Sequence, residues 1–232
     1  GPAGSGKTTL AKQAADALGR NFYATGAVVD KFELLGFVDA GGTYHASELY
    51  AALTDKTGAV FLFDEVDSSY PAPLNAFNAL LENGYITFPN GERIEVDRQK
   101  VSFIAAANTV GTGANRQYVG RFELDKAFLD RFRQIIVDYD EGIERDMALA
   151  AWIKSGGPQE HIRNAEAWVD IVRDFRKLLS DRRIGAICTT RATRAGAGLL
   201  ARGWTLDEVK ETELYKHLSH DQRQQLNIKE VE

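Results

Sequence analysis

The chain has 232 residues, of which 44% are hydrophobic and 26% charged, so it is long enough for one or two globular domains and is neither a fibre nor a disordered tail. Its 28 Lys and Arg residues against 33 Asp and Glu residues give a net charge of -5, which disfavours constitutive nucleic-acid binding but leaves a local basic patch open. A single cysteine, Cys188, excludes an intrachain disulfide, and no apolar run approaches the roughly 20 residues of a membrane-spanning helix, so we expect a cytoplasmic protein that does not enter a membrane.

The first eight residues match the phosphate-binding pattern G-x-x-x-x-G-K-[ST]. In such a loop, glycines let successive backbone N–H groups curve around an anion, the lysine reaches the β- and γ-phosphates, and the hydroxyl binds Mg²⁺. Apolar residues at helical spacing over 8–18, followed by Gly19, predict a helix whose N-terminus faces the phosphates. We therefore expect ATP and Mg²⁺, with nucleotide contacts from Gly1, Pro2, Ala3, Gly4, Ser5, Gly6, Lys7, Thr8 and Thr9.

Two hairpins interrupt the pattern of buried strands and helices. Residues 32–47 predict a small hairpin-like insertion, and a helix is expected over 48–53. Further along, residues 85–88 and 93–96 flank an Asn-Gly pair, which is a strong signal for a tight turn between strands.

Residues 59–65 form an apolar run that ends in two acids, as in a buried parallel strand whose carboxyl end opens onto a ligand site. Asp64 is predicted to help hold Mg²⁺ through water, and Glu65 to orient and polarise the water that attacks the γ-phosphate. The alternative is a plain buried strand with solvated acids.

A further buried strand over 101–107 delivers Asn108 at its end. The amide of Asn108 can hold the attacking water, or the residue can simply begin a turn. Residues 129–133, with the sequence LDRFR, then predict the end of a short helix, and residues 134–138 predict a fourth strand.

Together these motifs resemble AAA+ ATPases, with Walker A at residues 1–8, Walker B at 61–65, sensor 1 at Asn108 and a Leu-Asp-Arg-Phe string at 129–132. The strings at 64–67 and 107–111 are most similar to the MoxR and cobalt-chelatase ATPase-subunit branch. The resemblance implies an α/β P-loop NTPase core over residues 1–140, with a parallel sheet flanked by helices, and an all-α lid over 141–232. In this fold a central strand precedes the phosphate loop. Because the chain opens on Gly1 and its only methionine is Met147, we expect that strand upstream.

The resemblance also implies a homo-oligomeric ring, expected to be a hexamer, with each site between neighbouring subunits. Arg131 matches the arginine donated to a neighbour's site, where a guanidinium stabilises charge that develops on the γ-phosphate. Arg133 is the fallback, and Arg131 could instead pair with Asp130 or cap its helix. At the start of a helix in the lid, Arg191 matches sensor 2, with Arg194 on nearly the same helical face as the alternative.

Residues 141–232 show helical periodicity with almost no strand signal. Amphipathic helices are predicted over 144–155 and 160–180, and another helix from about 190 to 203. Capping boxes are predicted at 205–208 and 219–222, and the four histidines show no metal-ligand spacing.

These observations predict an ATP hydrolase that remodels or activates a protein partner or adaptor. ATP is favoured over GTP because no N-K-x-D guanine signature is present. Two alternatives stay open: a nucleic-acid-directed motor of the restriction type, for which the basic residues Arg93 and Arg98 are thin support, and a nucleotide-gated scaffold with little turnover.

Overall fold

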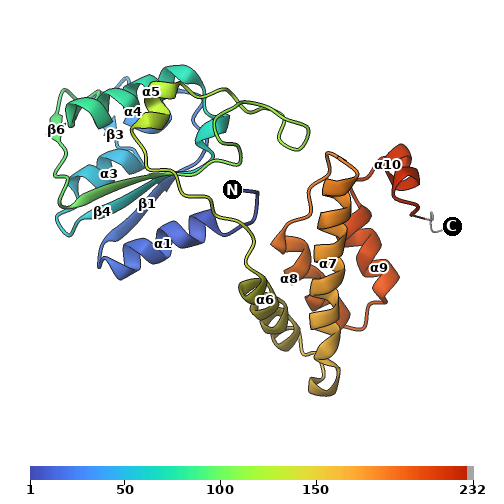
Figure 1. The fold of residues 1–232 in the computed structure, drawn as a ribbon. Coiled ribbons are helices and arrows are strands. Elements are labelled where there is room, and N and C mark those ends of the chain that lie inside the picture. Colours follow the sequence, from blue (N-terminus) through green and yellow to red (C-terminus); the bar gives the residue numbers. More distant parts are fainter. Residues whose placement is uncertain (229–232) are drawn as a thin grey trace. The chain divides into compact units, whose positions relative to one another are not determined.

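The computed structural model describes residues 1–228, which form two compact units (Figure 1). The first unit comprises Gly1 and residues 6–137, and the second comprises Pro2–Ser5 together with residues 138–228. A parallel sheet with flanking helices in the first unit, and helices in the second, confirm the α/β fold with a helical C-terminal part.

The first unit alternates helices and strands. Its elements are, in order, α1 (Lys7–Ala17), β1 (Asn21–Thr25), α2 (Lys31–Leu35), β2 (Phe37–Val38), β3 (Tyr44–His45), α3 (Glu48–Thr54), β4 (Ala59–Phe63), the 3-10 turn η1 (Val66–Ser68), α4 (Pro71–Asn83), β5 (Tyr85–Thr87), β6 (Arg93–Glu95), β7 (Val101–Ala105) and α5 (Lys126–Asp130).

The main sheet has the order β1-β4-β7, and all of its strands are parallel. The central strand β4 is fully buried because α1 packs on one face of the sheet, whereas α3 and α4 lie on the other (Figure 1). On the second face, Phe61 and Phe63 of β4 pack against Phe77 of α4 with ring centroids 6.0 and 5.3 Å apart. Burial on both faces explains why β4 reads as an unbroken apolar run.

The structure corrects the predicted strands. The segment at 134–138 is not a strand, although its sequence is apolar, and the side chains of Ile135 and Ile136 are 79% and 74% exposed. An apolar segment becomes a strand only where a neighbouring strand accepts its hydrogen bonds, and none of the strands described within residues 1–228 pairs with it. Conversely, β1 and α4 are present but were not predicted.

Both predicted hairpins are confirmed as antiparallel pairs, β2 with β3 and β5 with β6. In the second hairpin, Gly91 has φ +85°, and the Asn90 side chain accepts a hydrogen bond from the Glu92 N–H. The first hairpin is smaller than predicted, because Leu34 and Leu35 belong to α2.

The second unit is built from α6 (Glu141–Lys154), the 3-10 turn η2 (Gln159–His161), α7 (Arg163–Asp181), α8 (Thr190–Ala201), α9 (Leu206–Lys210), the π turn η3 (Glu211–Tyr215) and α10 (His220–Gln225). Both predicted capping boxes are confirmed, with Thr205 paired to Glu208 and Ser219 to Gln222. The predicted helices are present with ends shifted by a few residues.

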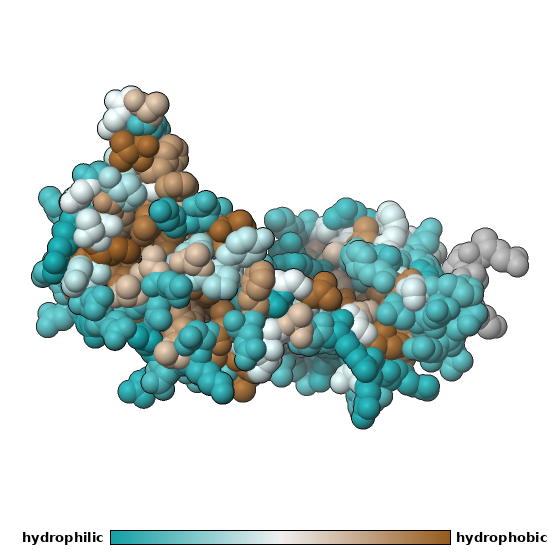
Figure 2. Space-filling model, turned by 90° about the horizontal axis from the view of Figure 1, so that it is seen from above, coloured by the Kyte–Doolittle hydropathy of each residue, from teal (hydrophilic) through white to brown (hydrophobic). Residues whose placement is uncertain are grey.

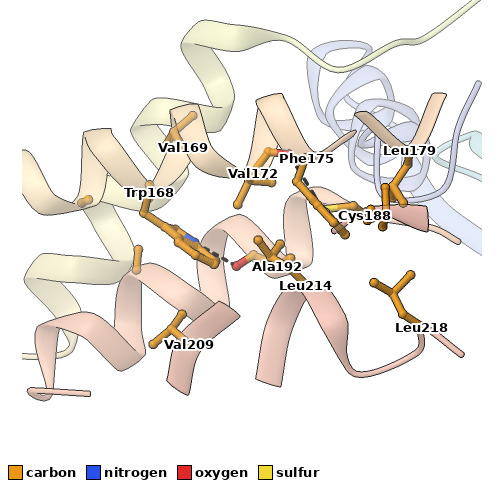
Figure 3. Close-up of a cluster of buried hydrophobic side chains, with 14 of the residues drawn as sticks. Trp168, Val169, Val172, Phe175, Leu179, Cys188, Ala192, Val209, Leu214 and Leu218 are labelled. Atoms are coloured by element: carbon orange, nitrogen blue, oxygen red, sulfur yellow. Dashed lines mark hydrogen bonds between the residues drawn. The ribbon is translucent and has the colours of Figure 1, made fainter. Parts of the chain in front are cut away.

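The core of the second unit surrounds Trp168, which points from α7 toward α8 (Figure 3). Its indole N–H donates to the carbonyl oxygens of Ala192 and Thr193. A Cβ at Gly196 would lie 2.2 Å from the indole ring, so a glycine is required where the two helices approach each other.

Within residues 1–228, no helix is both long enough and apolar enough to cross a bilayer. Hydrophilic side chains cover much of the surface in Figure 2, with apolar patches scattered among them. Single exposed apolar residues are normal on a folded protein.

Candidate nucleotide-binding site

The phosphate loop begins with a sharp turn and ends in a helix. Gly4 and Gly6 have φ values of +75° and +90°, a left-handed conformation that glycine adopts without strain. Gly6 is the N-cap of α1, and in the described part of the chain no side-chain hydrogen bond caps this helix N-terminus. Because the first N–H groups of a helix have no partner within the helix, this geometry suits an anion.

Lys7 lies at the centre of the candidate site. Its ammonium donates to the Gly1 carbonyl at 2.8 Å and to Oδ1 of Asn108 at 2.9 Å. Burial lowers the pKa of Lys7 below its usual value, although the charges of Asp64, Asp67 and Glu65 act in the opposite direction. The structure therefore places a partly buried cation between the phosphate loop and the end of β7.

Thr8 and Asp64 also meet. The Thr8 hydroxyl donates to Oδ2 of Asp64 at 2.6 Å, and Oδ1 of Asp64 accepts the N–H of Glu65 at 2.9 Å. A hydroxyl and a carboxylate are hard oxygen ligands, and Mg²⁺ commonly takes one or two protein ligands and fills its remaining positions with water and phosphate. The residues present therefore fit a nucleotide-bound Mg²⁺.

Glu65 follows in an unusual backbone conformation. Its φ is +49°, in the left-handed region that side chains other than glycine rarely adopt. Its side chain is 54% exposed, and Oε2 lies 3.5 Å from Nη1 of Arg121. Strained backbone of this kind concentrates at functional sites.

Sequence reasoning noted Asp67 only as part of a motif string and missed its role. Asp67 is fully buried, and its Oδ2 accepts the N–H of Asn108 at 3.1 Å and both the N–H and the hydroxyl of Thr109 at 2.9 Å. These bonds fix the turn that carries Asn108. Arg121 was missed entirely, because a lone arginine in a glycine-bearing loop carries no sequence signal.

Neither arginine-finger candidate is brought to this cluster. Arg131 forms an ion pair with Glu82 of α4, with Nη2 and Oε2 2.6 Å apart. It is also the C-cap residue of α5 and donates to the Ala127 carbonyl, so of the two alternative roles it caps its helix and pairs with Glu82 rather than with Asp130. Arg133 is exposed. Among residues 1–228, no hydrogen bond or ion pair joins Arg131 to Asp64 or Glu65.

Residues 2–5 of the loop belong to the helical unit and have contacts there. The Thr190 hydroxyl donates to the Gly4 carbonyl and the Tyr139 hydroxyl to the Ala3 carbonyl, both at 2.7 Å. A Cβ on Gly4 would lie 2.8 Å from Cβ of Thr189, the N-cap of α8. The sensor-2 candidates Arg191 and Arg194 lie in the first turns of α8, and both are exposed.

Residues 1–132, more than half of the chain, match the family model described as the AAA domain (dynein-related subfamily). The chain belongs to this family. It is 33% identical over 127 residues to the mitochondrial Lon protease homolog of Candida dubliniensis, an alignment that covers 48% of this chain and 11% of that protein. The chain thus spans about a tenth of the length of that curated relative.

Solved structures support the fold of this AAA domain. NtrX from Brucella abortus aligns with a TM-score of 0.55 and 18% identity, covering 88% of this chain and 45% of that chain. A point mutant of RuvB from Thermotoga maritima aligns with a TM-score of 0.50 and 16% identity, covering 99% of this chain and 74% of that one. The AAA+ resemblance is confirmed at the level of the family, whereas the MoxR-like branch stays a prediction.

Proposed function

We propose that this AAA domain binds ATP with Mg²⁺ and hydrolyses it. The observation that carries the proposal is the convergence of Lys7, Thr8, Asp64 and Asn108 at the carboxyl ends of two adjacent parallel strands, with Lys7 bonded to Asn108 and Thr8 to Asp64. Open α/β sheets bind ligands at this edge.

Each residue has a role that follows from its chemistry. Lys7 and the loop N–H groups hold the phosphates, with contacts from Gly1 to Thr9, and Thr8 and Asp64 supply oxygen ligands. Mg²⁺, when bound, neutralises charge on the phosphate oxygens. Glu65 accepts a proton from the attacking water, and Asn108 orients that water.

Replacing Glu65 with glutamine tests the proposal. The amide keeps the size of the side chain but cannot accept a proton from water, so we expect turnover to fall by about a hundredfold or more while ATP binding stays within about twofold of wild type. Phosphate release measures the first, and fluorescence of a labelled ATP analogue the second. Glu33→Gln, an exposed acid in α2, is the matched control. Turnover retained in Glu65→Gln would contradict the proposal.

The wider role is also a proposal. We place the nucleotide-binding core at residues 1–140 and a lid at 141–232, with Arg191 or Arg194 reaching the γ-phosphate. A MoxR-like hexameric ring that remodels a protein partner fits the two acids at the end of β4, which a scaffold with little turnover would not need. Nucleic acid is a less favoured partner, because the net charge is -5.

A further inference from the structure

An arginine that no sequence motif marks occupies the space between two acids beside the candidate site. Nη1 of Arg121 lies 3.5 Å from Oε2 of Glu65 and 3.6 Å from Oδ1 of Asp67. We propose that Arg121 is a positioning residue for Glu65: anchored on the buried Asp67, its guanidinium holds the Glu65 carboxylate in the orientation from which it accepts a proton from water.

The anchor is rigid. Asp67 is fully buried, its Oδ2 accepts hydrogen bonds from Asn108 and Thr109, and its buried Oδ1 has no hydrogen bond to any residue that the structure describes. A buried carboxylate needs a compensating charge, and among residues 1–228 Arg121 is the cation within ion-pair distance of Asp67. The pairing of Arg121 with Asp67 is therefore structural and does not depend on Glu65.

Backbone hydrogen bonds hold the segment that carries Arg121. The Phe122 N–H donates to the Asp67 carbonyl at 2.7 Å, and the Leu124 N–H donates to the Gly111 carbonyl at 3.0 Å. The Arg121 side chain is 12% exposed, and its buried Nε has no hydrogen-bond partner within residues 1–228. Buried polar atoms left unsatisfied cost free energy, and their retention in a native site calls for a functional reason.

The Glu65 side chain is held by fewer contacts than that of Asp67. It is half exposed, its own backbone has φ +49°, and Arg121 is the one described side chain within ion-pair distance of its carboxylate. Without that guanidinium, the Glu65 side chain would not be held in a single rotamer. A general base must lie within hydrogen-bond reach of the water it deprotonates, so loss of orientation lowers the rate of the chemical step more than the affinity for nucleotide.

The inference rests on the proposed function and is tested by steady-state ATPase kinetics on the full chain. We expect Arg121→Met to lower kcat by about tenfold or more, with KM and the affinity for a labelled ATP analogue within about twofold of wild type. Arg121→Lys, which keeps the charge on a flexible stem, should restore part of kcat. The matched control is Arg116→Met, an exposed arginine in the same loop, which should leave kcat unchanged.

Where Arg121→Met does not fold because Asp67 loses its counter-charge, the double variant Asp67→Asn and Arg121→Met removes both buried charges. Its kcat is compared with that of Asp67→Asn alone, because Asp67 also fixes the turn that carries Asn108. Wild-type kcat in either variant would overturn the inference, as would a rise in KM with kcat unchanged. Absence of turnover in the wild type would instead overturn the proposed function, and the inference with it.

Discussion

At the scale of single residues, Lys7 shows how burial and neighbouring charge oppose each other. Burial lowers the pKa of its ammonium, and Asp64, Asp67 and Glu65 raise it. A polyphosphate beside Lys7 would add negative charge and favour the protonated form. Its present bonds to Gly1 and Asn108 keep the ammonium satisfied and aimed at the loop.

Gly4 offers a residue-scale prediction. In Gly4→Ala, the alanine must adopt a left-handed backbone conformation, which is strained for a residue with a Cβ. The new Cβ would also lie 2.8 Å from Cβ of Thr189, so the loop must shift. We expect affinity for a labelled ATP analogue to fall by about tenfold, equivalent to about 1.4 kcal/mol.

The matched control is Gly91→Ala, at φ +85°, where no heavy atom of the described residues other than near neighbours in the chain lies within 4 Å of the added Cβ. It has the same backbone strain without the contact, and its nucleotide affinity should equal that of wild type. Equal affinities for Gly4→Ala and wild type would show that the loop tolerates a side chain at this position.

The site could be predicted from the sequence only as far as its contacts are local or carried by a motif. Lys7, Thr8, Asp64 and Asn108 lie at fixed places relative to a loop, a helix or a strand end, and the structure brings them together. Arg121 lies 56 positions from Glu65 in the sequence, and their contact depends on how the loop between β7 and α5 folds back. No periodicity or spacing in the sequence predicts that this loop brings Arg121 to Glu65.

At the scale of elements, a buried carboxylate joins three helices of the second unit through an ion pair and a hydrogen bond. Glu144 of α6 accepts from Arg176 of α7 at 2.8 Å and from Thr193 of α8 at 2.5 Å. Burial alone would raise the pKa of Glu144, but the hydrogen bonds from Arg176 and Thr193 and the charge of Arg176 outweigh it, so the pKa lies below its usual value.

Glu144→Gln should therefore destabilise this unit by roughly 3 kcal/mol at neutral pH, because it leaves Arg176 partly buried without its counter-charge. Unfolding in urea, followed by tryptophan fluorescence, measures the effect, because all three tryptophans, Trp152, Trp168 and Trp204, lie in this unit. The matched control is Glu141→Gln, an exposed acid on α6 whose surface ion pairs are worth less than about 1 kcal/mol.

The pH dependence has a defined sign. Because the pKa of Glu144 is lower in the folded state, its contribution to the free energy of unfolding is fully present above its unfolded-state pKa, about 4.3. That contribution is lost as the pH falls through the lower folded-state pKa. Wild type and Glu144→Gln should thus converge in stability at acid pH. A difference that stays constant down to about pH 3 would refute the assignment.

Element prediction succeeded where the signal is local. The capping boxes at Thr205 and Ser219 and the turn at Asn90 depend on residues a few positions apart, and all are present. The segment at 134–138 failed because a strand requires a partner that its own sequence cannot supply. The strand β1 is only partly buried, and its sequence lacks the continuous apolar run that identified β4.

At the scale of the whole molecule, the ring is the prediction to test. We expect the mass to rise from about 25.6 kDa to about six times that value when a non-hydrolysable ATP analogue is added, as measured by size exclusion with light scattering. A heterologous head-to-tail interface closes naturally into such a ring. An unchanged mass across a tenfold range of protein concentration would rule the ring out for this chain.

Arg131→Ala adds a functional readout to that experiment. If Arg131 is donated to a neighbour, it must leave Glu82, and its loss should lower kcat by about a hundredfold or more with ring mass unchanged. Loss of turnover in Arg133→Ala alone would assign the role to Arg133. Wild-type turnover in both variants would remove the arginine finger from the mechanism.

The left-handed backbone at Glu65 is a place where folding and chemistry would select different amino acids. Glycine or asparagine would relax the main chain there, and neither could take a proton from water. We therefore expect such replacements to raise the thermal stability of the protein and to lower its ATP turnover. Under the proposed function, the proton-accepting role of the carboxylate would offset this cost in conformational energy.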